Sequence, residues 1–397
     1  VMSVLFRYAF RPLFLLATLY AIVVVPLWVA GWLGVGPMPV SLGTPVWWHA
    51  HEMIFGFAGA AIGGFALTAV ATWTERPPVS GAPLIALSAL WLVARLSFFA
   101  PTSALLLPAI AADLGYGVLL AGLMSREVIS VRSSRNYKVL GLLALLPVAN
   151  LAFFFGLRTN ASWTMSALFA GMWVVVLLIN VIGGRIIPGF TRNWLRRRAD
   201  QGLRAPAKPP PAFDRFDLLT TLSMVLFAVL QLASAPQSAI ATVGLATGGL
   251  LLVRLARWQG HLGASEPLVW VLHVGFAWLP LGFVLLGLSA LELAPRTSGV
   301  HALTSGAITT MIVAVASRAA LGHTGRPLQS HPLLTTSYVL ITVAAIARVA
   351  ATFGPAAREL LLVSAVAWTL GFACFSWRYV PILTQPRVQK KGSLPVV

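Results

Sequence analysis

The chain has 397 residues, of which 58% are hydrophobic and only 10% are charged. Soluble domains carry about 25% charged residues, so this composition excludes an ordinary soluble protein and requires lipid around the surplus apolar surface. The formal net charge of +18 would suit a nucleic-acid-binding protein, but the distribution of that charge along the chain gives it another meaning.

Long apolar runs fill the chain and predict an all-α, polytopic transmembrane helical bundle. A helix needs about 20 mostly apolar residues to cross a bilayer, and only helices and closed barrels satisfy their own backbone in lipid. The runs are rich in Leu, Ala and Val and do not alternate, so we expect helices. The first run is expected to be a span, not a signal peptide, because it is long and lacks a small-residue cleavage site. Twelve spans are predicted, at 12–34, 49–73, 82–100, 104–124, 138–157, 162–184, 216–234, 237–256, 267–290, 299–321, 333–354 and 359–381.

Lysine and arginine gather on one side of these predicted spans. If the N-terminus is cytoplasmic, all but five of the 28 basic residues lie on the inner side or at its span ends. The five others are Arg95, Arg158, Arg296, Arg348 and Arg358. Such a bias satisfies the positive-inside rule, so both termini are predicted to be cytoplasmic. The positive charge is therefore explained by topology and by attraction to anionic lipids, and no nucleic-acid partner is expected.

One segment between spans is long enough to divide the chain. Residues 185–215 are basic and then proline-rich, which predicts a cytoplasmic linker. It separates a first six-span half, residues 1–184, from a second, residues 216–397. A six-plus-six layout is typical of transporters built from two repeated halves. However, the two halves show no convincing similarity, and their histidines do not recur at matching places.

Two histidines and a glutamate open the second predicted span. His49 and His51 are two residues apart, or about 200° around a helix, so they point to different sides. Such a pair suits two neighbouring metal centres, or one ligand and one residue that supports it, better than two ligands of one ion. Glu52 follows His49 by three residues and can share its face, where a carboxylate would orient a ligating imidazole. The alternative is that these residues are only interfacial anchors.

His301 opens the tenth predicted span at the same face of the membrane. With His49 and His51 it gives three neutral nitrogen donors, which suit copper, zinc or haem iron. His273 lies roughly 9 Å into the ninth span from the inner side, and His323 follows the tenth span there. His301 and His323 are about 33 Å apart on a continuous helix, so they cannot ligate one iron unless that helix breaks.

Ionisable residues inside the spans are functional hypotheses by default, because they are costly in lipid. Asp113 and Arg95 lie in neighbouring antiparallel spans and form either a structural ion pair or part of a proton or anion path. Arg348, in the eleventh span, is a candidate to hold a propionate or another anion.

Five stretches, taken in chain order, carry a family resemblance. They read FRPLFLLATLYA, WHAHEMIFGFA, GGRIIPGFTRNW, LHVGFAWLPLG and HALTSGAITTMIVAVASRAALGHTGRP. As a set they resemble the NnrS family of twelve-span bacterial membrane proteins linked to nitric-oxide metabolism, and they cover the chain nearly end to end.

The resemblance implies haem b and copper bound in the bacterial inner membrane, and a role in protection from nitric oxide. The family's histidines fall on His49, His51, His273, His301 and His323. Three arginines of the inner face are candidates to hold a propionate or to orient a ligand: Arg185, Arg318 and Arg326.

The leading hypothesis is therefore a membrane haem protein, with copper, that binds or reduces nitric oxide or a related small molecule. Both an oxidoreductase and a protein that only binds the gas fit the sequence, and no electron donor is indicated. The alternative is a twelve-span transporter of an anion, a metal or haem.

Overall fold

The computed structural model describes residues 2–99, 103–202 and 208–388, and all secondary structure in these ranges is helical. Twelve of its helices are long and apolar enough to cross a membrane, which confirms the predicted all-α bundle of about twelve spans. They are α2 (Phe10–Trp32), α3–η1–α4 (Pro45–Thr74), α5 (Ala82–Phe99), α6 (Leu106–Ser130), α7 (Tyr137–Thr159), α8 (Ala161–Asp200), α9 (Arg215–Leu232), α10 (Gln237–Arg257), α11 (Pro267–Ala290), α12–η5–α13 (Arg296–His323), α14 (Pro332–Ala350) and α15 (Ala357–Thr384). Short helices are α1 (Met2–Leu5), η2 (Ser103–Leu105), η3 (Ser134–Asn136) and η4 (Gly260–Gly263).

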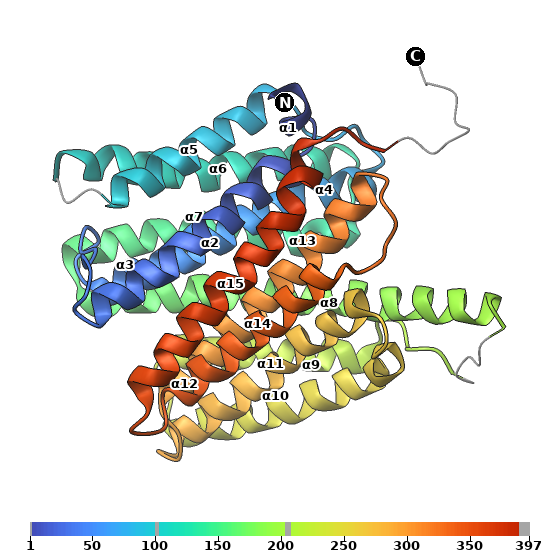
Figure 1. The fold of residues 1–397 in the computed structure, drawn as a ribbon. Helices are drawn as coiled ribbons and strands as arrows, with labels where there is room; N and C mark the ends of the chain where they lie inside the picture. The colour runs from blue at the N-terminus through green and yellow to red at the C-terminus, as the bar shows by residue number, and fades with distance from the viewer. Residues whose placement is uncertain (1, 100–102, 203–207, 389–397) are drawn as a thin grey trace.

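Three spans form the centre of the bundle. The span containing η1 and α4, the span containing η5 and α13, and helix α8 all contact one another. The other helices surround them, with α15 between α14 and α2, α10 against α9 and α11, and α5 against α6 (Figure 1). Large apolar side chains such as Leu96, Leu107 and Leu151 are exposed on the outer helices, where lipid would cover them.

Helix α8 is longer than the sequence predicted. It continues beyond the expected end at residue 184 to Asp200, so helix covers the first part of the segment predicted as a linker. Pro188 lies inside this helix without ending it, and Arg196 and Arg197 on the added turns are exposed. The basic end of α8 projects beyond the other helices (Figure 1). The division into two six-span halves stays a prediction.

Two of the central spans contain a π-helical segment, and in both a histidine immediately precedes it. Segment η1 (Glu52–Ala58) follows His51, and η5 (Ala302–Ile308) follows His301. The hydroxyl of Thr309 donates to the carbonyl of Thr304, five residues earlier, at 3.1 Å. Single π-turns are rare and occur often at functional sites, because they re-aim the side chains around them.

A glycine in each π segment allows a large side chain to pack against the backbone. A Cβ atom at Gly56 would lie 2.5 Å from Nη1 of Arg95, and one at Gly306 would lie 2.4 Å from the indole of Trp278. Both distances are too short for any side chain. These glycines therefore let neighbouring helices bring Arg95 and Trp278 into the centre of the bundle.

Candidate functional site

A cavity of about 280 Å³ lies at the end of the bundle where α3 and α12 begin, and both His49 and His301 line it. We call this end the histidine end and this space the histidine cavity. Its walls come from α2, α3, η1, α8, α12, η5, α13, α14 and α15, and they are mostly apolar, with Trp28, Phe57 and Trp368 among them. Helix α1 lies at the opposite end of the bundle (Figure 1).

Each of the two cavity histidines has one ring nitrogen that no described residue engages, so it is available to a ligand. The His49 ring stacks on Trp28 with centroids 4.5 Å apart, and its buried Nδ1 has no hydrogen-bond partner among the described residues. Nδ1 of His301 lies 2.7 Å from the carbonyl oxygen of Thr297, one helical turn earlier. Because a carbonyl only accepts, Nδ1 carries the proton and donates, and the lone pair is on Nε2. Such a bond is the usual way to orient a ligating imidazole.

Two arginines and several hydroxyl groups complete the wall of the histidine cavity. The Arg296 guanidinium lies over the ring of Phe169, 4.3 Å from its centroid, and 3.4 Å from the side-chain oxygen of Gln231. Arg348 lines the cavity from α14. The hydroxyl-bearing wall residues are Thr297, Thr304, Ser305, Ser364 and Thr309.

A second, more polar cavity adjoins the first. It measures about 710 Å³, and Met165, Phe169 and Arg296 line both spaces. Its other walls include Ser166 and Glu292. We call this space the vestibule. The vestibule therefore adds a space with polar walls beside the histidine cavity, at the histidine end of the bundle.

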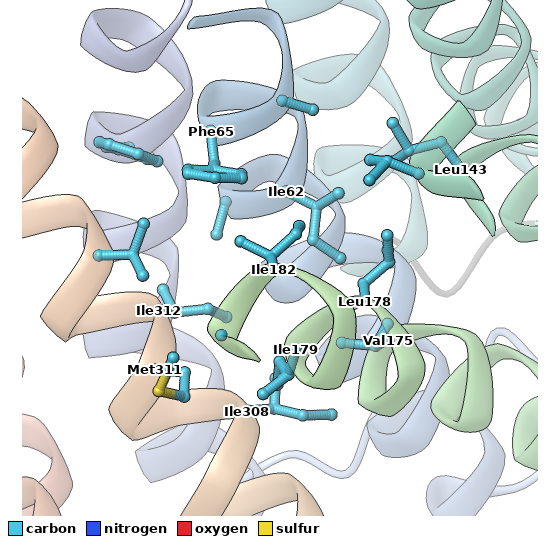
Figure 2. Close-up of a pocket in the computed structure, with 16 residues that line it drawn as sticks. Ile62, Phe65, Leu143, Val175, Leu178, Ile179, Ile182, Ile308, Met311 and Ile312 are labelled. Carbon is cyan, nitrogen blue, oxygen red and sulfur yellow. The ribbon is translucent and has the colours of Figure 1, made fainter. Parts of the chain in front are cut away.

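A third space, of about 70 Å³, lies deeper between α4, α8 and α13. Figure 2 shows that only carbon and sulfur atoms surround it, from residues such as Ile62, Val175 and Met311. Ile308 of η5 lines both this space and the histidine cavity. An apolar lining of this kind offers water no hydrogen-bond partner and suits small apolar molecules.

His51 lies on the other side of its helix, with both ring nitrogens engaged. Nδ1 is 2.9 Å from the Glu52 carboxylate, while Nε2 is 3.0 Å from the amide oxygen of Asn150 and 3.2 Å from the Asp113 carboxylate. All four residues are buried. The Glu52 carboxylate was expected to orient His49, but the structure pairs it with His51 and with a cation from α5.

That cation is Arg95, which links the two carboxylates. It forms an ion pair with Asp113, and its Nε is 3.4 Å from the Glu52 carboxylate. The Tyr20 hydroxyl donates to Glu52, and the Asn150 amide donates to Asp113 at 2.6 Å. We call His51, Glu52, Arg95, Asp113 and Asn150 the buried ion network.

The other two predicted histidines lie near the opposite end of the bundle. Nε2 of His273 is 2.9 Å from the Thr191 hydroxyl, and its buried Nδ1 has no partner among the described residues. Gly260 lies against this ring, where a Cβ would come within 2.5 Å. The His323 ring packs near Phe10, with centroids 5.7 Å apart. Neither histidine lines the histidine cavity.

The three arginines predicted to hold a propionate are also absent from the wall of that cavity. Arg185 donates to the carbonyl of Arg135 at 2.8 Å, and Arg318 lies 3.8 Å from the ring centroid of Phe190. Arg326 donates to the side-chain oxygen of Gln385, just after α15. The arginines that do line the cavity are Arg296 and Arg348, at the other end of the bundle.

The predicted trio of metal ligands does not converge. Within the described ranges, no three His, Cys, Asp or Glu side chains come together as a metal-binding group. The structure brings His49 and His301 to one cavity and keeps His51 in the buried ion network. Sequence reasoning missed Trp28, Arg296 and the π segments. The sequence did contain one feature shared by the two π segments: a glycine follows His51 and His301 by five residues in both cases.

Fold and site together define a multi-pass membrane protein with a histidine-lined cavity at one end of its bundle. Residues 4–387 match the family model described as NnrS protein, which covers nearly the whole chain. The chain therefore belongs to the NnrS family, as the sequence motifs predicted. A search of curated proteins found no match.

Proposed function

We propose that this protein binds haem b in the histidine cavity, with His49 and His301 as the protein ligands, and that it handles nitric oxide there. The observation that carries the proposal is the pair of imidazoles, from two central spans, that face one apolar cavity with a free nitrogen each. Membership of the NnrS family supports a role in the nitric-oxide response.

The donor set fits haem better than a bare metal ion. Structural zinc sites use four ligands and catalytic ones three protein ligands, whereas haem iron already has four ring nitrogens and needs one or two axial ligands. Two imidazoles without a third donor therefore favour haem in this cavity. The cavity is slightly smaller than the usual range for ligand sites, about 300–1,000 Å³. The adjoining vestibule adds polar space for the edge of a larger group.

Copper has a weaker basis than haem in this structure. A copper ion would use imidazoles outside the haem site. His273 has a buried nitrogen without a partner among the described residues, and it is the candidate that the geometry favours. His51 is less suited, because carboxylate and amide groups occupy both of its nitrogens.

The residues around the cavity have separable roles in this proposal. The Thr297 carbonyl fixes the His301 tautomer, Trp28 holds the His49 ring, and the apolar walls exclude water. Bound haem would supply an iron atom at which nitric oxide would take the place of one of the two imidazoles. Nitric oxide is small and uncharged, so the apolar space beside Ile308 suits its approach from lipid.

We place the protein in the bacterial inner membrane with both termini in the cytoplasm. The support is the excess of Lys and Arg at one side of the spans. The histidine cavity then lies toward the outer face. The second candidate function, a transporter of an anion, a metal or haem, is favoured by the vestibule, which adjoins the cavity.

The test is an absorption spectrum of the detergent-purified protein, oxidised and dithionite-reduced, with and without nitric oxide. We expect a Soret band that shifts with nitric oxide, and, before nitric oxide is added, an altered haem spectrum or a lower haem content in the His301→Ala variant, which lacks one of the two imidazoles. A colourless protein after expression with ample haem would discard the haem proposal. Substrate-dependent flux into liposomes would then favour the transporter.

A further inference from the structure

Arg348 brings a positive charge into the wall of the histidine cavity without a visible counter-charge. It lies in the last turn of α14 and is only partly exposed. No Asp or Glu is among the described residues that line the cavity. The ion pairs of the described residues involve other cations, including Arg95 and Arg254.

Comparison with those two arginines shows what Arg348 lacks. Arg95 and Arg254 also lie in membrane spans, and each faces a carboxylate: Asp113 for Arg95, and Asp217, at 2.6 Å, for Arg254. Charges at membrane depth are costly unless they are paired, and buried charges in proteins are normally paired for the same reason. An occupant of the histidine cavity that carries negative charge would give Arg348 the partner that the described residues do not provide.

The second arginine of the cavity is less available than the first. Arg296 already lies over the Phe169 ring and near Gln231, and it is exposed at the vestibule. Arg348 has the more enclosed position, on the same cavity as both free imidazoles. The geometry therefore selects Arg348 as the stronger binding partner for a negative group.

We propose that Arg348 anchors a planar, carboxylate-like anion at the histidine cavity. A guanidinium can hold such a group with two parallel hydrogen bonds, which a lysine ammonium cannot reproduce. Two sources have this chemistry: a propionate carboxylate of haem, or a small free anion such as nitrite. Only the first source rests on the proposed haem site.

The test compares Arg348→Gln and Arg348→Lys with the wild-type protein, and uses Arg358→Gln as the matched control. Arg358 is an exposed arginine at the start of α15 and does not line the cavity. In the first arm, the full-length proteins are loaded with haem b or with its dimethyl ester, in which both carboxylates are blocked. The rate of haem transfer to apomyoglobin is then measured.

If a propionate is the anion, Arg348→Gln loses haem b at least tenfold faster than wild type, and Arg348→Lys is intermediate. The dimethyl ester is lost equally fast from wild type and Arg348→Gln, and Arg358→Gln behaves as wild type. The melting temperature of each variant shows whether the fold is retained.

In the second arm, nitrite is titrated into the wild type and the variants by calorimetry, with and without haem. If a free anion is the partner, wild type binds nitrite at least tenfold more tightly than Arg348→Gln. Equal haem loss and equal nitrite affinity in wild type and Arg348→Gln would overturn the proposal. A wild-type protein that takes up no haem would refute the haem site instead, and the nitrite arm would still decide the role of Arg348.

Discussion

His49 and His51 are two residues apart in one span, yet the structure gives them opposite surroundings. His49 faces an apolar cavity with a nitrogen that no described residue satisfies, and no carboxylate lies among the described residues that line this cavity with Arg348. His51 is enclosed by Glu52, Asp113 and Asn150, with both nitrogens bonded. The histidine of the first region has a ring nitrogen without a partner among the described residues, whereas the histidine of the second region has partners for both nitrogens.

The difference separates a ligand site from a structural one. Buried polar groups are costly when unpaired, so the free groups around His49 and Arg348 indicate a missing partner. In the buried ion network the carboxylates of Glu52 and Asp113 face Arg95 and His51, so the network is expected to hold α3, η1, α5, α6 and α7 together. Substitutions in the two regions should therefore affect different properties: ligand binding in one, stability in the other.

The largest expected effect comes from breaking the buried ion network at its cation. Arg95→Ala leaves two buried carboxylates, Glu52 and Asp113, without their guanidinium, which should destabilise the protein by about 3–5 kcal/mol. The measurement is thermal unfolding of the detergent-purified protein. Arg126→Ala is the control, because Arg126 pairs with Glu127 from a mostly exposed position and should cost about 0–1 kcal/mol. Equal melting temperatures for the two variants would contradict the role given to the network.

The two neighbouring histidines give the next largest contrast. His51→Ala leaves Asn150 and the two carboxylates short of a donor, and each unsatisfied buried group costs about 1–3 kcal/mol. His49→Ala removes no hydrogen bond between described residues and should melt close to wild type in the haem-free protein. A melting curve of each variant is sufficient. If His49→Ala were the less stable of the two, the comparison would fail.

The π segments can be tested by adding one methyl group. Gly56→Ala would bring a Cβ within 2.5 Å of Arg95, and overpacking of this kind typically costs about 1–3 kcal/mol. Gly122→Ala in α6 is the matched change, since nothing lies within 4 Å of the new methyl group. It should be neutral or stabilising by up to about 1 kcal/mol, because alanine is the better helix former. If Gly56→Ala left the melting temperature unchanged, Arg95 would not be held firmly against Gly56 of η1.

The smallest effect is expected outside the spans, at the start of α9. Asp214 caps this helix by accepting from the backbone of Phe216 and Asp217, and Asp214→Ala should cost about 1 kcal/mol. The hydrogen bond from Arg257 holds the pKa of the Asp214 carboxyl below its usual value. A lowered pKa means that this contribution is present above about pH 4 and is lost only as the pH falls further. The difference in melting temperature between wild type and Asp214→Ala should therefore be constant from pH 5 to 8.

The sequence predicted the spans because apolar runs of the required length are a strong signal. Helical periodicity also separated His49 from His51. The partner of Glu52 could not be predicted, since it depends on how α5, α6 and α7 place Arg95, Asp113 and Asn150. The π segments were missed for another reason. A π-helical turn contains about one residue more than an α-helical turn, and in a span that is apolar almost throughout this leaves the hydrophobic pattern almost unchanged.

The end of α8 shows a similar limit. A basic, polar sequence after residue 184 was expected to be a linker, because it cannot lie in lipid. It can still continue as a helix outside the apolar layer, and nothing before Asp200 stops it. Composition therefore predicted the apolar span but not the end of the helix.

The most direct test of the account is the haem and copper content per polypeptide of three purified proteins. They are the wild type, the His49→Ala/His301→Ala double variant, and a His261→Ala/His331→Ala control whose histidines are exposed and outside the cavity. The account predicts haem in the wild type and the control, and at least a tenfold loss in the His49/His301 variant with the fold retained. Full haem content in that variant would contradict the assignment of the histidine cavity as the haem site.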